Sequence, residues 1–135
     1  MSQNKLPIGV CAIIRRDDKF LAVSRKNNCG MWGLPGGKVD MDESVEQALL
    51  REVLEETNLE VSIDKVLHTE ICEGETDYLT IGFLCHTLSD YEYDSYIQAE
   101  PGCYYEWLTE EELCSQYMTP FWKYNINLFK ALQTC

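Results

Sequence analysis

The stretch Gly36–Leu59, GGKVDMDESVEQALLREVLEETNL, determines how the rest of the chain is interpreted. It opens with two glycines and an acidic loop, and it continues into Val45–Thr57, a segment without Gly or Pro. Glu52, Glu55 and Glu56 project from one side of a helix, because positions i, i+3 and i+4 share a face. Such like charges repel one another, and a divalent cation with oxygen ligands relieves the repulsion. The stretch therefore predicts a helix that carries a metal site.

Both ends of this predicted helix carry local capping signals. Ser44 is a good N-cap, and Gln47 three residues later completes a capping box. Asn58 follows the helix at a position that favours a residue able to adopt the left-handed conformation. A broad apolar arc is expected to pack against the core. Its members are Val45, Leu49, Leu50, Val53 and Leu54.

Length and composition indicate one globular domain. The chain has 135 residues, of which 45% are hydrophobic and 25% charged, enough for one core. No apolar run approaches the ~18 residues of a membrane helix, and the N-terminus lacks an apolar signal core, so we expect a cytoplasmic protein.

The seven cysteines form an odd, scattered set without a CxxC pair. They predict reduced thiols rather than a disulfide framework or a zinc site.

The net charge of the chain restricts the kinds of ligand that it can bind. A net charge of −12 argues against direct binding to a nucleic-acid polymer, which needs a basic surface. The same negative charge would also repel a small phosphate substrate, unless a bound metal makes the local charge positive.

Runs of apolar and β-branched residues between turn residues predict the strands of the domain. They are expected over Leu6–Arg15, Lys19–Ser24, Glu60–Ile63, Val66–Cys72, Tyr78–His86 and Tyr104–Leu108. Polar and Gly-containing segments predict loops over Lys26–Gly33 and Leu88–Glu100. A short helix should follow its cap Thr109, and an amphipathic helix should cover Phe121–Leu132. Strands interleaved with helices predict a single α/β (α+β) domain over residues 1–135.

The opening stretch resembles the Nudix box, written G-x5-E-x7-R-E-U-x-E-E-x-G-U, where U is an aliphatic residue. Eight of its nine fixed positions are matched, and these are Gly37, Glu43, Arg51, Glu52, Val53, Glu55, Glu56 and Leu59. The ninth, a Gly in the family, is Asn58 here, and Asn also tolerates the left-handed conformation. The preceding Trp32–Gly36 also looks like the family's usual approach to the box.

The resemblance implies a Nudix fold, a mixed β-sheet sandwiched between α-helices. It also implies hydrolysis of a nucleoside diphosphate linked to another moiety, with Mg²⁺ (or Mn²⁺) as cofactor. The implied metal ligands are Glu52, Glu55, Glu56 and the carbonyl oxygen of Gly36. Glu52, Glu55 and Arg51 are the expected catalytic residues, with Arg51 orienting Glu52 through a charge-assisted hydrogen bond. Glu43 would hold the loop through the helix or Arg51.

General chemistry agrees with this resemblance. Hydrolysis of a phosphoanhydride requires neutralised phosphate charge and a nucleophilic water, and bound divalent metals supply both. A carboxylate such as Glu52 can take the proton of that water.

Residues outside the box are candidates for contacts with the substrate. Arg25 and Lys38 are the nearest basic residues and are candidates for phosphate contacts, although Arg25 is equally suited to pairing with an acid. Trp32 is suited either to stacking on a base or to packing. Glu100 would add a metal-binding carboxylate or be a plain loop acid. Asn125 falls where MutT-like members place a base-reading Asn, although surface Asn is common on helices.

The stripe Phe121, Tyr124, Leu128 and Leu132 on the last helix is expected to belong to the core rather than to a substrate pocket.

The family resemblance leads to a MutT-like (deoxy)nucleoside triphosphate diphosphatase that releases the monophosphate and pyrophosphate. Hydrolysis of ADP-ribose or another nucleoside diphosphate derivative is the alternative reaction, and a non-catalytic nucleotide-binding module is the alternative of another class. The expected partner is a small nucleotide, not a nucleic-acid polymer or a membrane. Either a monomer or a homodimer is compatible with the sequence.

Overall fold

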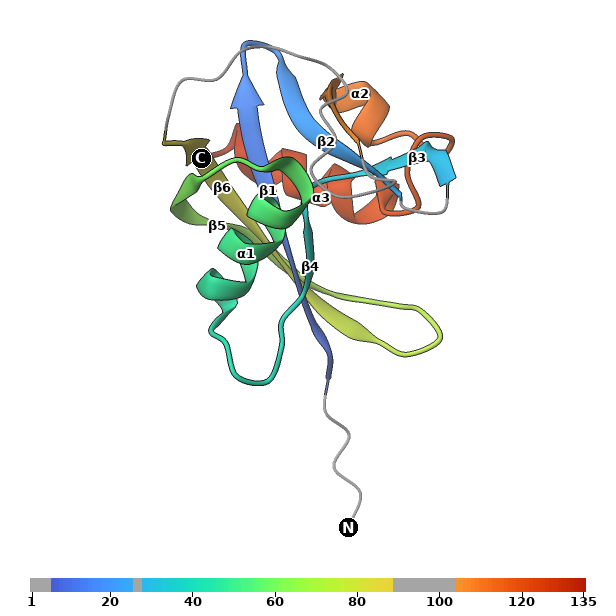
Figure 1. Ribbon diagram of the computed structural model, residues 1–135. Coiled ribbons are helices and arrows are strands. Elements are labelled where there is room, and N and C mark those ends of the chain that lie inside the picture. The colour runs from blue at the N-terminus through green and yellow to red at the C-terminus, as the bar shows by residue number, and fades with distance from the viewer. Residues whose placement is uncertain (1–5, 26–27, 89–103) are drawn as a thin grey trace.

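The structure is a computed structural model that describes residues 6–25, 28–88 and 104–135. Along the described part of the chain, four strands precede the first helix, three more strands follow it, and two helices come last (Figure 1). The strands are β1 (Ile8–Arg16), β2 (Lys19–Arg25), β3 (Asn28–Gly33), β4 (Gly36–Lys38), β5 (Val61–Cys72), β6 (Tyr78–Thr87) and β7 (Tyr105–Thr109). The helices are α1 (Val45–Thr57), α2 (Glu110–Leu113) and α3 (Trp122–Gln133). None of the helices in these ranges is long and apolar enough to span a membrane.

A mixed sheet forms the centre of the domain. Its main path runs in the order β3-β2-β1-β6-β5, with β4 paired to β1 and β7 paired to β2. Strands β1 and β6 are parallel, from the pair Ile8 and Leu79 to the pair Ile14 and Cys85, whereas the other pairings are antiparallel. The sheet therefore has the mixed character that the resemblance to the Nudix family implies.

Two hydrophobic clusters hold helices to opposite faces of this sheet. Val10, Ala12 and Ile14 of β1 belong to the first cluster, whereas Cys11 and Ile13 pack with the second. Because neighbouring strand residues point to opposite faces, the two clusters lie on opposite sides of the sheet.

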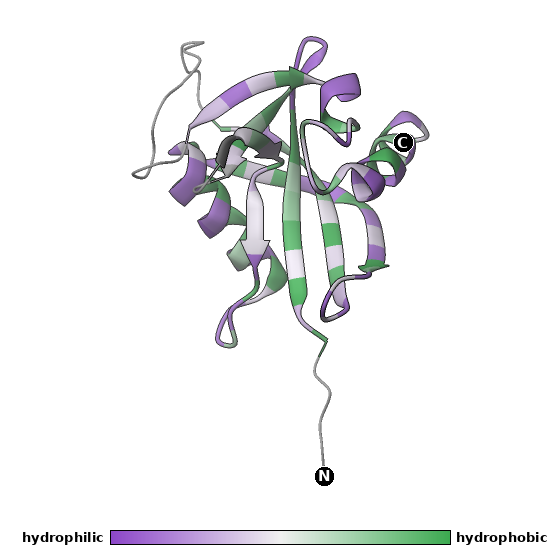
Figure 2. Ribbon diagram, turned by 90° about the vertical axis from the view of Figure 1, so that its right-hand side faces the viewer, coloured by the Kyte–Doolittle hydropathy of each residue, from purple (hydrophilic) through white to green (hydrophobic). Residues whose placement is uncertain are grey.

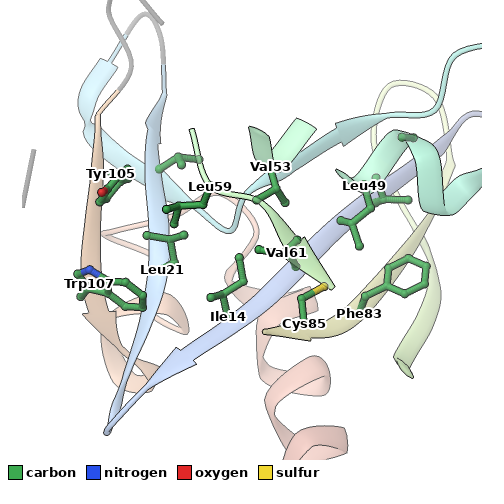
Figure 3. Packing of buried hydrophobic residues seen from close by; sticks show 14 residues of the cluster. Ile14, Leu21, Leu49, Val53, Leu59, Val61, Phe83, Cys85, Tyr105 and Trp107 are labelled. Atoms are coloured by element: carbon green, nitrogen blue, oxygen red, sulfur yellow. The ribbon is translucent and has the colours of Figure 1, made fainter. Parts of the chain in front are cut away.

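Helix α1 covers the first cluster and α3 covers the second. Leu49 and Val53 of α1 belong to the first cluster, and Figure 3 shows Leu49 on the side of Phe83 and Val53 on the side of Leu59 and Val61. Leu128 and Phe129 of α3 lie in the second cluster. The long central strands carry hydrophobic stretches in Figure 2, whereas the outer turns of the helices are hydrophilic. This is the predicted sandwich of a mixed sheet between helices.

Helix α1 confirms the predicted bounds and caps. The Ser44 side chain accepts the Gln47 N–H at 3.1 Å, and the Gln47 side chain accepts the Ser44 N–H at 2.8 Å. Asn58 adopts φ 61° and donates its N–H to the carbonyl of Leu54. The helix is thus terminated locally at both ends, as capping predicts.

The predicted apolar arc of α1 was too broad. Leu49 and Val53 are fully buried, but Leu50 and Leu54 are 40% and 45% exposed. Each follows a buried residue by one position, about 100° around the helix, which turns it away from the sheet. The buried face instead includes Ala48 and Thr57.

Three other expectations need correction. Residues 28–33, predicted as loop, form β3, because pairing with β2 satisfies their backbone groups despite Asn and Gly. The two strands predicted around Asp64-Lys65 form one strand, β5, whose register shifts between Ile63 and Lys65 and between Val66 and His68. Helix α3 begins at Trp122, with Phe121 as its N-cap. The loop predicted over 88–100 lies outside the described residues except for Leu88.

Candidate metal and nucleotide site

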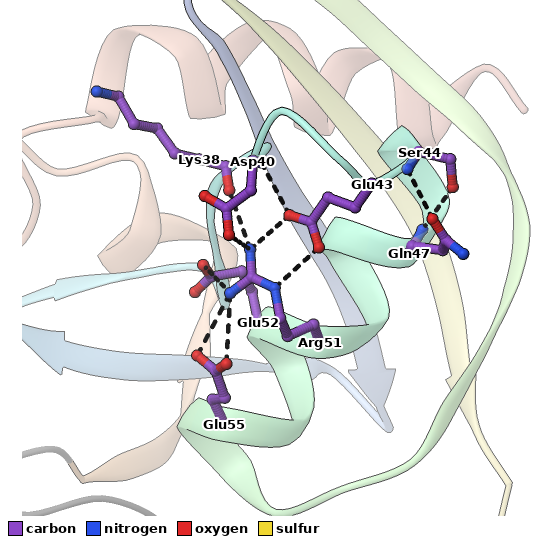
Figure 4. A network of polar contacts seen from close by, with 8 residues as sticks. All are labelled: Lys38, Asp40, Glu43, Ser44, Gln47, Arg51, Glu52 and Glu55. Atoms are coloured by element: carbon purple, nitrogen blue, oxygen red, sulfur yellow. Dashed lines mark hydrogen bonds and ion pairs between the residues drawn. The ribbon is translucent and has the colours of Figure 1, made fainter.

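Arg51 is the centre of a polar network between α1 and the loop before it (Figure 4). Its Nε donates to Glu43 Oε2 at 3.0 Å and its Nη2 to Glu43 Oε1 at 2.6 Å. The Asp40 N–H also donates to Glu43 Oε1, at 2.9 Å. The bonds from Arg51, with a smaller contribution from the Asp40 N–H, lower the pKa of Glu43 to about 2. Glu43 therefore stays ionised at neutral pH and ties the loop to the helix.

The same guanidinium reaches the predicted metal ligands. Arg51 Nη1 donates to Glu52 Oε1 at 2.9 Å and lies 3.4 Å from Glu55 Oε1. Its Nη2 donates to the Lys38 carbonyl of β4 at 3.2 Å. Arg51 is thus placed beside Glu52, where the Nudix resemblance expects it.

Glu52 differs from Glu55 in its surroundings. Its side chain is 17% exposed, whereas that of Glu55 is 51% exposed. Burial raises the pKa of Glu52, and the opposing effect of Arg51 is smaller. A carboxylate whose pKa is moved toward neutrality is suited to accept a proton.

Strand β4 approaches α1 closely because it begins with two glycines. The Gly36 N–H donates to Glu56 Oε1 at 2.8 Å. A Cβ at position 37 would lie 2.5 Å from Cδ of Glu52. At position 36 it would overlap the carbonyl oxygen of Val10. A larger residue at position 36 would therefore push β4 away from β1, and one at position 37 would displace the Glu52 carboxylate.

The residues present suit a hard divalent cation, but their carboxylates are not gathered around one point. Among the described residues, no three His, Cys, Asp or Glu side chains are close enough to hold an ion without rearrangement. Glu52 and Glu55 are turned toward Arg51, and Glu56 toward the Gly36 N–H. Glu55 is exposed, and its contacts with Arg51 at 3.4–3.5 Å are long. The Glu55 side chain can therefore rotate toward Glu52 without a change in the backbone. The carboxylate oxygens of these residues are the type of ligand that Mg²⁺ prefers.

A pocket of about 290 Å³ lies beside β4, on the face of the sheet that α3 covers. Gly36, Gly37 and Lys38 form one wall of it. The other walls are largely apolar and include Ile8, Val10, Leu34, Tyr78, Phe121 and Tyr124. Strand β4 therefore borders both the helix carboxylates and an apolar pocket, a combination that suits a ligand with phosphates and a flat apolar part.

The predicted substrate residues fall in different places. Lys38 is exposed and borders the pocket. Asn125, which is 2% exposed, also lines it, and its Nδ2 donates to the Leu113 carbonyl at 2.7 Å. Trp32 is instead partly buried against the second cluster. The side chain of Arg25 and all of Glu100 lie outside the described part of the chain.

Sequence reasoning missed two aromatic residues that line the pocket, Phe121 at the N-cap of α3 and Tyr124 within the helix. The stripe predicted as core is buried at Tyr124 and Leu128, but Phe121 is 40% exposed. Both Phe121 and Tyr124 contribute to the pocket wall. The sequence contained one signal for Phe121. It stands four residues before Asn125, a predicted substrate residue, and residues at i and i+4 share a face of a helix.

The geometry agrees with comparisons to known proteins. Residues 5–131 match the family model of the NUDIX domain. The chain therefore belongs to the Nudix family. Members of this family generally use a divalent metal such as Mg²⁺ and act on small nucleotide substrates.

Several curated relatives match the chain over shorter segments. It is 44% identical over 62 residues to an ADP-ribose pyrophosphatase of Methanocaldococcus jannaschii, which covers 44% of this chain and 37% of that protein. It is 46% identical over 57 residues to a CTP pyrophosphohydrolase of Escherichia coli, covering 40% and 42%. It is 31% identical over 90 residues to an 8-oxo-dGTP diphosphatase of Proteus vulgaris, covering 64% and 80%. The first two matches span less than half of each relative.

Solved structures resemble nearly the whole chain. A NUDIX hydrolase from Nitrosomonas europaea superposes with a TM-score of 0.77 at 26% identity, over 94% of this chain and 90% of that one. A MutT protein from Methanosarcina mazei gives a TM-score of 0.70 at 28% identity, over 98% of each chain. The mixed sheet between helices is thus the fold of Nudix hydrolases.

Proposed function

We propose that this chain hydrolyses a pyrophosphate bond of a nucleotide. The favoured reaction converts a (deoxy)nucleoside triphosphate to the monophosphate and pyrophosphate with Mg²⁺ or Mn²⁺. Strand β4 is the main support, because it contacts Glu56 and Arg51 and also borders the apolar pocket. A nucleotide whose base occupies the pocket would present its phosphates beside the helix carboxylates.

The residues of the site have separate tasks in this proposal. Glu52, Glu55, Glu56 and the Gly36 carbonyl would hold the metal, and the unplaced Glu100 is a further candidate. The bound metal would neutralise the phosphate charge and acidify a water molecule. Glu52 accepts the proton of the attacking water, whose oxygen bonds to one phosphorus while the bond from that phosphorus to the bridging oxygen breaks, so that monophosphate and pyrophosphate are released. Arg51 holds Glu52 in position, and Lys38 contacts the phosphates from the pocket rim.

The named relatives support two substrate classes. A CTP pyrophosphohydrolase and an 8-oxo-dGTP diphosphatase favour a nucleoside triphosphate. An ADP-ribose pyrophosphatase of similar identity favours the second candidate, a nucleoside diphosphate derivative. A non-catalytic nucleotide-binding module is the third candidate, and the presence of every acidic residue of the box argues against it.

Product analysis separates the three candidates. The intact chain is incubated with saturating Mg²⁺ and a panel of NTPs, dNTPs, ADP-ribose and dinucleoside polyphosphates. Monophosphate and pyrophosphate from a triphosphate support the first candidate, and AMP with ribose 5-phosphate from ADP-ribose supports the second. Nucleotide binding without any product would support the third candidate, a non-catalytic nucleotide-binding module.

We propose further that residues 1–135 form a single domain that works in the cytoplasm as a monomer or homodimer. Sedimentation analysis of the purified chain tests the oligomeric state.

A further inference from the structure

Asp40 lies in the loop between β4 and α1, at a position that the Nudix box leaves unspecified. Its carboxylate Oδ2 lies 3.4 Å from Nη2 of Arg51, and its side chain is 73% exposed. A single exposed ion pair contributes little to stability, because water screens the charges and both side chains lose freedom. The place of this charge beside Arg51 therefore matters more than the free energy of the pair.

The hydrogen-bond donors of Arg51 are divided between two sets of acceptors. Its Nη1 faces the expected metal ligands, Glu52 at 2.9 Å and Glu55 at 3.4–3.5 Å. Its Nε and Nη2 face the loop, where Glu43 and the Lys38 carbonyl are the acceptors. These bonds use the donor capacity of a guanidinium, which has five N–H groups. Asp40 therefore adds negative charge on the loop side rather than another hydrogen bond.

The backbone holds Asp40 on that side of the guanidinium. Its N–H donates to Glu43 Oε1 at 2.9 Å, and its carbonyl accepts the Glu43 N–H at 3.3 Å. Glu43 is in turn bound by Arg51 through both carboxylate oxygens. Figure 4 shows the Asp40 carboxylate above the guanidinium and Glu55 below it. Asp40 and Glu55 thus contact Arg51 from different sides.

The two sides of Arg51 have different tasks when a divalent cation binds. Glu55 faces Arg51 in this structure and would have to turn away from it to bind the cation. The guanidinium then loses a negative neighbour and gains a positive one, and like charges repel. The negative charges on the loop side remain, and they are the ones that can hold Arg51 in place.

We propose that Asp40 is a positioning residue that keeps Arg51 beside Glu52 while the metal is bound. Its carboxylate offsets the repulsion between the guanidinium and the cation, and Arg51 in turn fixes the orientation of Glu52. The inference rests on the proposed function for the presence of the metal, but its first test does not depend on turnover.

Binding of Mn²⁺ alone to the intact chain, measured by calorimetry, is the first readout. Asp40→Asn keeps the size and the backbone bonds of the residue and removes its charge, whereas Asp40→Glu keeps the charge. Asp42→Asn is the matched control, because it removes the same charge from an exposed residue of the same loop. Among the described residues, no hydrogen bond or ion pair engages the Asp42 side chain.

The proposal predicts that Asp40→Asn raises the Kd for Mn²⁺ by about tenfold, while Asp40→Glu and Asp42→Asn stay within about threefold of the unmodified chain. Urea titrations without metal should give the same stability for Asp40→Asn and Asp42→Asn. A loss of stability that accompanies the loss of affinity would make the role of Asp40 structural and would overturn the proposal.

A second change separates an effect through Arg51 from a direct effect on the metal. In the Arg51→Gln variant, the further change Asp40→Asn should leave the Kd for Mn²⁺ nearly unchanged, because residues that act through one another are not additive. A full additional loss of affinity there would mean that Asp40 attracts the metal directly, and the positioning role would be wrong.

The outcomes also distinguish this inference from the proposed reaction. If Asp40→Asn binds Mn²⁺ as tightly as Asp42→Asn does, Asp40 has no positioning role, even where hydrolysis is observed. If the unmodified chain hydrolyses no nucleotide but Asp40→Asn still weakens the binding of Mn²⁺ alone, the reaction is wrong and the role of Asp40 stands. In turnover assays at saturating Mn²⁺, Asp40→Asn should lower kcat and leave the KM for the nucleotide within about twofold.

Discussion

The carboxylate of Glu52 occupies the space that a side chain at Gly37 would need. A Cβ built at position 37 lies 2.5 Å from Cδ of Glu52 and 2.7 Å from both carboxylate oxygens. A side chain at this position of the box would therefore have to displace the Glu52 carboxylate. No left-handed backbone conformation needs to be invoked for the glycine.

Gly37→Ala should reduce activity more than stability. The added methyl group displaces the Glu52 carboxylate, and a displacement of ~1 Å costs about 100-fold in rate when the group is catalytic. Initial rates with Mg²⁺ and a urea titration measure the two effects. Gly74→Ala in the turn between β5 and β6 serves as the control, and an equal loss of rate there would contradict the explanation.

Glu55→Gln and Glu56→Gln should each lose most turnover while the protein stays folded. Even residues that only orient metal ligands change metal affinity by about 10–100-fold, so loss of a ligand should cost at least ~100-fold in rate. Rates over a Mg²⁺ titration and circular dichroism provide the measurements. Full rates in both variants would remove these residues from the metal site.

The pKa of Glu43 predicts a dependence of stability on acid. Its value of about 2 in the folded chain lies below the ordinary value of about 4.3 for an unfolded Glu. The stabilisation from ionised Glu43 is thus complete above about pH 4.3 and is lost as the pH falls toward 2. In Glu43→Gln the decline in unfolding free energy between these values should be shallower. Urea titrations at several pH values test this, and parallel curves for the two proteins would contradict it.

Asn125→Ala should affect both substrate choice and stability. It leaves the Leu113 carbonyl without the Asn125 donor, a loss that typically costs about 1–3 kcal/mol. It also removes the amide from the pocket, so the relative kcat/KM values among bases should change. Chemical denaturation and a base panel measure the two effects separately. An unchanged base profile would show that Asn125 has only a structural role.

Adjacent leucines of α1 should respond very differently to truncation. Leu49 is fully buried, so Leu49→Ala should cost about 2–5 kcal/mol of unfolding free energy. Leu50 is 40% exposed, so Leu50→Ala should cost much less, on the order of 0.5 kcal/mol. Urea denaturation of the two variants provides the comparison. Equal losses would mean that α1 packs with a different face.

The sequence predicts those parts of the molecule that depend on local signals. The bounds of α1 follow from Ser44, Gln47 and Asn58, which act within a few residues of the helix ends. The placement of Arg51 beside Glu43 and Glu52 follows from the spacing of the box. These features need little information from the rest of the fold.

Features that depend on tertiary contacts were not predictable in this way. Strand β3 exists because β2 offers a partner, although its Asn and Gly residues favour a loop. Leu50 and Leu54 look like core residues until the sheet limits the width of the buried face. Phe121 has only its spacing to Asn125 as a signal in the sequence, and the position of the start of α3 beside β4 makes it a pocket residue. In each case the neighbour that decides the outcome is distant in sequence.

The irregular register of β5 also bears on self-association. Among the described strands β5 is paired only with β6, so its other side is an open edge. Exposed Val66 and Ile71 would make a straight edge of this length a template for pairing with another chain. The two register shifts bend the strand and interrupt its ladder, and the exposed Asp64 and Lys65 lie at the first of them. These irregularities therefore protect the edge against aggregation.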